Sequence, residues 1–221
     1  MPYYLQYDGS DYVTAPTLGN VLTSTVRINA KKVKIDSATN QGYWFSQAGL
    51  IGASRELGVF PTSIGGLNAF FGGVQSVGLT AAEISAEFGS TLIDSELLSF
   101  EINMSTGAYA FYNNSSTAFK TGTASVGTGR VNGVLFRLGG RSADNTAGST
   151  TGAFVAPSSW TIGDTEVLIN GVMVRDYVMP STGSVITDTL NSSNNATLQN
   201  APIDNSQWVF YEEPSSGPEI A

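Results

Sequence analysis

Asp164 and Glu166 are a pair of carboxylates whose spacing raises the question of acid–base chemistry. They stand two residues apart in Ile-Gly-Asp-Thr-Glu-Val, which has the alternation of a β-strand, so both side chains point to one face. An inverting glycosidase keeps its two carboxyl groups about 6.5–9.5 Å apart to leave room for a water molecule. This pair is too close for that arrangement, and a solvated strand face is the simpler interpretation.

The chain contains no histidine and no cysteine. Their absence excludes a Ser-His-Asp triad, a histidine general base, Cys/His zinc sites and disulfide bonds. The sequence lacks a P-loop, and Gly127-Thr128-Gly129 precedes no helical pattern, so it does not support dinucleotide binding. With the usual acid–base and nucleophilic routes closed, we expect a protein without enzymatic activity.

The charge balance is acidic, with a formal net charge of −8 and a pI near 4.4. This balance opposes nucleic-acid binding. No apolar run approaches the length that spans a membrane, so no membrane insertion is expected. Met1-Pro2-Tyr3-Tyr4 enters a strand pattern without the regions of a signal peptide, which predicts synthesis in the cytoplasm without one.

The composition is typical of many short strands joined by polar turns. The 221 residues include 25 glycines, and only 13% are charged. All-β sandwiches of this length are often single domains. We therefore predict one all-β domain over residues 1–211, followed by a mobile tail over residues 212–221, which is rich in Pro, Ser and Gly.

The segment Leu98–Asn113 predicts the hairpin around which the domain is built. Apolar and polar residues alternate along Leu98–Met104, Ser105-Thr106-Gly107 supplies a turn, and Ala108–Asn113 forms the return strand. A lone hairpin is marginal in water, so its apolar face needs a second layer. The hairpin therefore favours an antiparallel two-sheet sandwich.

Other short segments show strand patterns, and one segment shows the pattern of a helix. Thr80–Gly89 has a capping box from Thr80 and Glu83 and a terminal glycine, which predicts a short helix over about residues 80–88 at the rim of the sandwich. The remaining strands are expected at Tyr3–Tyr7, Asp11–Ala15, Thr25–Ile35, Gly42–Gln47, Leu57–Phe60, Leu67–Phe71, Val134–Leu138, Thr165–Tyr177 with a turn or bulge at Asn170-Gly171, and Gln207–Tyr211.

Lys31, Lys32 and Lys34 are three of only four lysines in the chain, and all lie in the predicted strand Thr25–Ile35. We favour an edge strand whose lysines discourage pairing with other molecules. The alternative is a patch that binds an anionic partner. Gly139–Ser159 is the longest loop-like stretch, and loops of this length are either functional or tolerated insertions.

Four segments resemble the laminin-G-like, concanavalin A-like jelly-roll family. Tyr4-Leu5-Gln6-Tyr7-Asp8-Gly9-Ser10-Asp11-Tyr12-Val13 resembles its opening strand, Leu138-Gly139-Gly140-Arg141 a strand end, and Ile162–Ile169 its Ile-Gly-Asp strand. Val174–Pro180 is similar to the segment that follows in phage-encoded members, which are virion or tail surface proteins. The resemblance implies a jelly roll whose terminal strands, Tyr3–Tyr7 and Gln207–Tyr211, pair with each other.

The resemblance also implies a carbohydrate site and a calcium site. For carbohydrate we expect an exposed aromatic platform at Trp160 with Arg141, Asp144 and Asn145 beside it, the alternative being that Trp44, Trp160 and Trp208 are all core. No cofactor is expected unless calcium binds at Asp144 and Asn145; Asx residues in turns, including Asp8 and Asp11, usually bind their own backbone instead. The laminarinase-type Glu-x-Asp-x-x-Glu motif of related hydrolases is absent.

Three functions follow from this resemblance. They are a lectin-like adhesin on a phage particle, a purely structural capsid or tail decoration protein without glycan binding, and a degenerate laminarinase-like glycoside hydrolase. We favour a non-enzymatic, lectin-like virion surface protein that presents its loops outward. Its expected partners are virion capsid or tail proteins and carbohydrate, its expected location is the virion, and it is expected to be oligomeric there.

Overall fold

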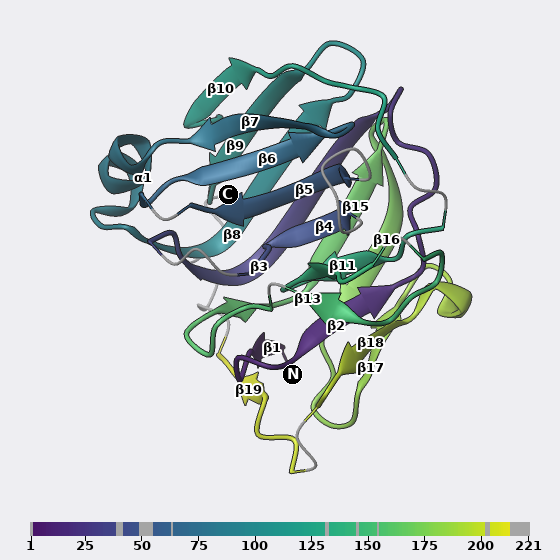
Figure 1. The fold of residues 1–221 in the computed structure, drawn as a ribbon. Helices are drawn as coiled ribbons and strands as arrows, with labels where there is room; N and C mark the ends of the chain where they lie inside the picture. The colour runs from purple at the N-terminus through teal and green to yellow at the C-terminus, as the bar shows by residue number, and fades with distance from the viewer. Residues whose placement is uncertain are drawn as a thin grey trace, which may run out of the picture.

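Alternation of apolar and polar residues builds antiparallel strands in two layers (Figure 1). The computed structural model describes residues 2–38, 42–48, 55–62, 64–130, 133–144, 146–153, 155–201 and 204–212. Its helices are α1 (Ala81–Phe88) and the short 3-10 helix η2 (Ser192–Asn194). Its strands are β1 (Tyr3–Gln6), β2 (Tyr12–Ala15), β3 (Thr25–Asp36), β4 (Phe45–Ala48), β5 (Arg55–Pro61), β6 (Leu67–Phe71), β7 (Val74–Leu79), β8 (Leu92–Asn103), β9 (Ala108–Asn113), β10 (Lys120–Thr123), β11 (Phe136–Leu138), β12 (Arg141–Ser142), β13 (Gly152–Ala153), β14 (Thr161–Ile162), β15 (Thr165–Ile169), β16 (Val172–Val178), β17 (Val185–Asp188), β18 (Ala196–Gln199) and β19 (Trp208–Phe210).

The first layer runs in the order β10-β9-β8-β3. Beyond β3 it divides. Along the first half of β3 the next strand is β15, which pairs in turn with β16. At the second half the next strand is β14, followed by β1 and then β19. The second layer runs β7-β6-β5-β4-β11-β2-β18-β17. Strand β17 also pairs with β16 and so joins the layers. This is the antiparallel two-sheet jelly-roll sandwich predicted from the sequence.

The core lies between the two layers and is rich in phenylalanine. Phe100 of β8, which is 1% exposed, lies with its ring centroid 5.8 Å from that of Phe45 and 6.0 Å from that of Phe71, both in the second layer. Phe111, across the hairpin, is 4.8 Å from Phe100. Such ring pairs stabilise a core beyond the area that they bury. The predicted hairpin therefore supplies the apolar face on which the second layer packs.

The hairpin and the pairing of the chain ends are confirmed. Strands β8 and β9 pair antiparallel from Leu98↔Asn113 to Ile102↔Tyr109, although β8 begins earlier than predicted, at Leu92. Strands β1 and β19 lie side by side (Figure 1), with Tyr3 opposite Phe210 and Leu5 opposite Trp208. Residues 213–221 of the expected tail lie outside the described residues.

Helix α1 has the predicted caps. The Thr80 side chain accepts a hydrogen bond from the Glu83 amide, the Glu83 side chain accepts from the Thr80 amide, and Gly89 ends the helix at φ 73°. Ile84 is buried, and the Phe88 ring meets Phe119 edge to face at 5.8 Å. The helix thus docks beside β8 at one end of the sandwich (Figure 1). No helix in the described part of the chain has the length and apolar character needed to cross a membrane.

The edge-strand interpretation of Thr25–Ile35 is wrong, because β3 has neighbours on both sides. Strand β8 pairs along its whole length, and β15 and β14 pair on the other side. The lysines lie on the outer face of this central strand, where they remain in contact with solvent. The alternation of buried and exposed residues is interrupted at Lys31-Lys32 and at the facing pair Glu96-Leu97, because both residues of each pair lie outside the core. Lys32 has a φ of 49° at this point.

The sequence patterns missed β7 and β10, and also the short strands β12, β13, β17 and β18. β7 follows the Gly72-Gly73 turn and pairs with β6. β10 lies within the small, polar segment after the hairpin and pairs with β9. Asn170-Gly171 forms the predicted turn between β15 and β16, with φ values of 52° and 78°. Strands β7 and β10 lack long apolar runs, so their strand structure depends on the neighbours that they extend.

Candidate functional site

The exposed sugar platform expected at Trp160 is wrong, because the structure buries this side chain. Trp160 is 1% exposed and directly precedes β14. Its ring packs against Gly42 so closely that a Cβ atom there would lie 3.0 Å from the ring. The Trp160 carbonyl oxygen accepts a hydrogen bond from the Tyr7 amide at 3.2 Å. Trp160 therefore belongs to the core, as Trp44 and Trp208 also do.

The other residues expected at that platform do not form an open site either. Arg141 is buried, and its Nη1 donates to the Ser142 carbonyl oxygen at 2.9 Å. Both oxygens of Asp144 serve the loop itself: Oδ1 accepts from the Thr146 amide and Oδ2 from the Ser149 hydroxyl group, each at 2.8 Å. These bonds hold the pKa of Asp144 below its ordinary value.

Asn145, the other expected ligand, lies outside the described residues. Calcium binding at Asp144 and Asn145 stays a prediction. Among the described residues, no group of three or more Asp, Glu, His or Cys side chains could hold a metal ion.

The long loop Gly139–Ser159 is fastened to the body of the domain. The Tyr12 hydroxyl group donates to the Thr150 carbonyl oxygen at 2.5 Å and accepts from the Gly152 amide at 2.8 Å. Arg137 is fully buried beneath the loop and donates through Nη2 to the Ser149 carbonyl oxygen. Burial lowers the pKa of Arg137 to about 10. These contacts connect the loop to β2 and β11.

The carboxylates Asp164 and Glu166 line a small hollow of about 250 Å³ on the outer face of the first layer. Glu166 Oε2 accepts from the Asn29 side chain at 2.9 Å. Asp164 Oδ1 accepts from the Met179 amide at 2.9 Å, and its Oδ2 lies 3.7 Å from Lys31 Nζ. Each carboxylate is thus engaged with the protein, which agrees with a structural role on a polar strand face.

A larger hollow, of about 470 Å³, lies on the same outer face beside the paired chain ends. We call it the terminal-strand hollow. It combines aromatic rings, both charge signs and small hydroxyl groups. Its lining residues are Tyr4, Gln6, Lys32, Lys34, Asp94, Glu96, Ser159, Thr161, Phe210 and Tyr211.

The aromatic side of this hollow is built by the two ends of the chain. The rings of Tyr4 and Tyr211 lie 6.0 Å apart at 40°. Lys32 Nζ lies 4.6 Å from the centre of the Tyr211 ring, a cation–π contact, and also forms an ion pair with Glu96. Lys32 therefore holds the Tyr211 ring beside the hollow, and the ion pair with Glu96 holds Lys32 on the sheet.

The charged side of the hollow comes from the central strands. Lys34 of β3 stands opposite Asp94 of β8 in the antiparallel register, and Lys32 is ion-paired with Glu96. Two lysines therefore face two carboxylates. The hollow offers ammonium donors, carboxylate acceptors and the Gln6 amide, which can do both.

A further hollow, of about 320 Å³, adjoins the terminal-strand hollow and is lined by Gln6, Tyr7, Asp8, Ser158, Ser206 and Gln207. We call it the Gln207 hollow. Gln207 is 3% exposed, and neither end of its side-chain amide has a hydrogen-bond partner in the described structure. The Tyr7 hydroxyl group is also buried without a partner, and burial raises its pKa well above the ordinary value. Each such unmet group costs about 1–3 kcal/mol.

Asp8 is a charged group of the Gln207 hollow. Its partial burial raises its pKa, but hydrogen bonds from Ser10 and from the Asp11 amide outweigh this effect. The pKa of Asp8 therefore lies below its ordinary value, and the side chain is a carboxylate at neutral pH.

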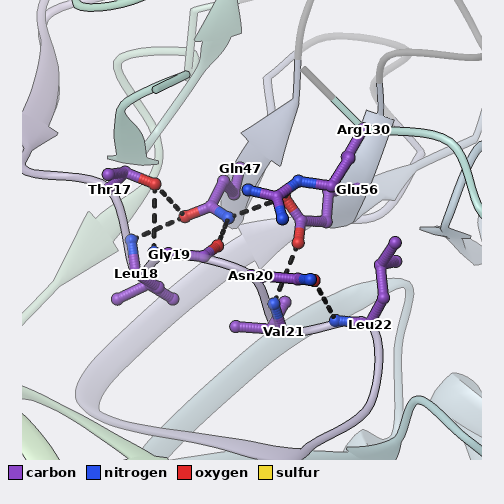
Figure 2. A network of polar contacts seen from close by, with 9 residues as sticks. All are labelled: Thr17, Leu18, Gly19, Asn20, Val21, Leu22, Gln47, Glu56 and Arg130. Carbon is purple, nitrogen blue, oxygen red and sulfur yellow. Dashed lines mark hydrogen bonds and ion pairs between the residues drawn. The ribbon is translucent and has the colours of Figure 1, made fainter. Parts of the chain in front are cut away.

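A separate polar cluster lies in the second layer (Figure 2), where Arg130 Nε is 3.8 Å from Glu56 Oε2. Glu56 is 1% exposed; its Oε1 accepts from the Val21 amide at 3.0 Å and its Oε2 from Gln47 Nε2 at 2.9 Å. Gln47 also binds the Leu18 amide and the Gly19 carbonyl oxygen. These bonds hold the segment 17–22 on the sheet, so the cluster has a structural role.

Comparisons with known proteins show likeness in fold. The chain is similar to the crystal structure of a protein of Bacteroides ovatus ATCC 8483 that is provisionally assigned as carbohydrate-binding, with a TM-score of 0.55 and 12% identity over 90% of this chain. This chain corresponds to 58% of that protein's length. A native heptameric SAP-like pentraxin of Limulus polyphemus matches with a TM-score of 0.43 and 16% identity, over 75% of each chain. No family model matches the chain, and no curated protein sequence matches it.

The sequence contained the parts of the terminal-strand hollow without showing that they meet. The sequence predicts that the two aromatic chain ends pair with each other. For the lysines it favours edge protection, with a patch that binds an anionic partner as the alternative. Neither prediction places the lysines beside the chain ends. Tyr4, Lys34 and Tyr211 come together only because β1 pairs with both β14 and β19, and β14 pairs with β3. The one signal available was the concentration of three lysines within four residues.

Proposed function

We propose that this protein is a non-enzymatic, lectin-like protein that binds carbohydrate in the terminal-strand hollow. A sugar offers hydroxyl groups that both donate and accept, together with apolar C–H faces. The hollow supplies acceptors in Asp94 and Glu96 and a donor in Lys34, next to the Tyr211 ring. Binding sites of this kind combine aromatic walls with a few polar groups that fix orientation.

The observation that carries the proposal is the placement of Tyr211. Its ring borders the hollow, and two contacts hold it there: the Tyr4 ring at 6.0 Å and Lys32 Nζ at 4.6 Å. A ring held in advance loses little freedom when a ligand stacks on it. The fold likeness to the Bacteroides ovatus protein supports the same class of ligand.

The test begins with a glycan array, followed by calorimetry on the bound glycans. Tyr211→Ala and Lys34→Ala should each weaken binding at least about tenfold, which corresponds to roughly 1.4 kcal/mol. Tyr112→Ala is the control, because Tyr112 lies on β9, away from the hollow, beneath Arg27 at 4.5 Å. Absence of any glycan binding by the folded protein, or equal affinity in all variants, would refute the proposal.

The absence of catalysis is tested with the same material. Incubation with β-glucans and alginate should release no reducing ends. Release that disappears in Glu166→Gln would instead support the degenerate hydrolase.

We also propose, from the sequence resemblance to phage-encoded members, that the protein is displayed on a virion. Mass spectrometry and immunogold labelling of purified particles should detect it. If it is present but binds no glycan, and host adsorption is unchanged in Tyr211→Ala, the structural decoration role replaces the adhesin role. A protein found only free in the cytoplasm would contradict both.

A further inference from the structure

The terminal-strand hollow and the Gln207 hollow meet at one residue. Gln6 lines both, and the adjacent residues Ser158 and Ser159 line one each. Gln6 is exposed. Its backbone amide donates a hydrogen bond to the backbone carbonyl oxygen of Gln207 at 2.8 Å, which holds the two chain segments together at this point. A ligand that fills the first hollow can therefore extend past Gln6 into the second.

Gln207 is the unusual group of the second hollow. Its side-chain amide has a donor and an acceptor, and both are buried without a partner among the described residues. A buried polar group without a partner destabilises the fold, so such a group calls for an explanation. Gln207 is one of the residues that line the hollow, and a ligand hydroxyl group or one bridging water molecule would supply the missing hydrogen bonds.

We propose that the Gln207 hollow is a second subsite, which binds a further unit of a neutral oligosaccharide. The side-chain amide of Gln207 forms hydrogen bonds with the hydroxyl groups of this unit. This inference rests on the proposed carbohydrate binding and adds to it the length and charge of the ligand. The ligand is an oligosaccharide of at least two units, not a single sugar.

The charges around the second hollow determine which sugars fit. Among its lining residues Asp8 is the charged side chain, and Asp11 lies buried next to it in the same turn. Lys32 and Lys34 line only the first hollow. An anionic sugar unit would approach Asp8 without a cation to balance it, because like charges repel at short range. The second subsite therefore selects neutral units over uronic or sialic acids.

The competing explanation for Gln207 is a trapped water molecule with no role in binding. The two explanations predict different effects of Gln207→Leu. Leucine removes two unmet polar atoms, so the variant should unfold at a temperature equal to or above that of the wild type in either case. Only the subsite predicts that this variant also loses affinity for long ligands. In that case Gln207 lowers the stability of the free protein but is needed for binding, so its replacement improves the first and impairs the second.

The experiment measures affinity against chain length by calorimetry. The probes are laminari-, cello- and malto-oligosaccharides from one to six units, with mannuronate oligomers of equal length as the anionic series. For the wild type, affinity for a neutral series should rise at least tenfold between the one-unit and the three-unit ligand. Gln207→Leu should abolish this rise and leave the affinity for the shortest ligand that binds unchanged. Asp8→Asn should narrow the difference between neutral and anionic series.

The outcomes separate this inference from the proposed function. If Tyr211→Ala removes binding but Gln207→Leu keeps the full rise in affinity with ligand length, the subsite in the Gln207 hollow is refuted. Carbohydrate binding in the terminal-strand hollow is then still supported. If no neutral series binds to the wild type, both are refuted for these ligands. In case Gln207→Leu fails to fold, the side-chain amide signals of Gln207 in the wild type provide the answer by NMR. A three-unit ligand should shift them and a one-unit ligand should not; equal spectra would refute the subsite.

Discussion

Asp8 and Asp11 each bind the backbone of the other. The Asp8 amide donates to Asp11 Oδ1 at 2.9 Å, and the Asp11 amide donates to Asp8 Oδ1 at 3.0 Å. The two residues have different environments, because Asp8 is exposed and Asp11 is fully buried. Burial raises the pKa of Asp11 to about 7; the hydrogen bond from Asp8 opposes this rise, and the negative charge of Asp8 adds to it. One turn therefore holds a permanent carboxylate and a carboxyl group that titrates near neutrality.

The first prediction concerns the pH dependence of stability. An Asp side chain ionises near pH 4 in the unfolded chain, whereas Asp11 keeps its proton to about pH 7 in the folded protein. Between these values the folded state holds the extra proton, so Asp11 lowers the free energy of unfolding as pH rises, by at most about 1.4 kcal/mol per pH unit. Above pH 7 the effect of this group is constant.

Asp11→Asn cannot ionise and should remove this decline. The free energy of unfolding of the variant relative to the wild type, from urea titrations, should rise by about 2–4 kcal/mol between pH 4 and 7. Asp204→Asn is the control: hydrogen bonds from Ser206 hold the pKa of Asp204 below its ordinary value, so it is ionised in both states over most of this range. Parallel curves for wild type and Asp11→Asn would contradict the prediction.

The second prediction concerns the fastening of the long loop. Tyr12→Phe removes one oxygen atom and with it the hydrogen bonds to the Thr150 carbonyl oxygen and from the Gly152 amide. We expect a loss of about 1–3 kcal/mol in the free energy of unfolding, because the Gly152 amide loses its partner. Hydrogen exchange at Gly152 should accelerate, while Tyr112→Phe leaves it unchanged. Unaltered exchange in Tyr12→Phe would show that the loop does not depend on this contact.

The third prediction compares two glycines with similar backbone angles. Gly107 has a φ of 76°, and a Cβ atom there would lie 1.9 Å from the Ala124 carbonyl oxygen. Gly19 has a φ of 82°, with nothing within 4 Å of such an atom. Gly19→Ala should cost only the strain of the backbone, about 1–2 kcal/mol. Gly107→Ala should cost at least about 3 kcal/mol, since β9 and the segment after β10 must also separate. Equal losses in denaturant titrations would contradict the close approach.

The fourth prediction concerns the cluster in Figure 2. Both oxygens of Glu56 accept hydrogen bonds, one from the Val21 amide and one from Gln47 Nε2. Glu56→Gln has the same shape but replaces one acceptor with a donor, so one donor must face another. We expect a loss of about 1–3 kcal/mol and faster hydrogen exchange at Val21. Glu101→Gln, at an ion pair of 3.7 Å near the surface, should change stability by less than about 0.5 kcal/mol. Wild-type stability in Glu56→Gln would refute this account of the cluster.

The sequence by itself determined the elements whose causes are local. Alternation along Leu98–Met104 fixed which side chains of β8 face the core, and the capping box at Thr80 fixed the start of α1. Asn170-Gly171 marked the turn between β15 and β16. Each depends on residues close together in the chain, so its pattern is visible without knowledge of the fold.

Only the tertiary structure decided which strands are neighbours and which aromatic side chains are covered. Period-two alternation separates the inner from the outer face of a strand but does not separate an edge strand from a central one, and the lysines of β3 were misplaced for this reason. Trp160 is covered because Gly42 and the pairing of β14 with β1 and β3 close around it. The terminal-strand hollow likewise needs residues from both ends and the middle of the chain. Such contacts arise from the free energy of packing distant segments, which no local pattern records.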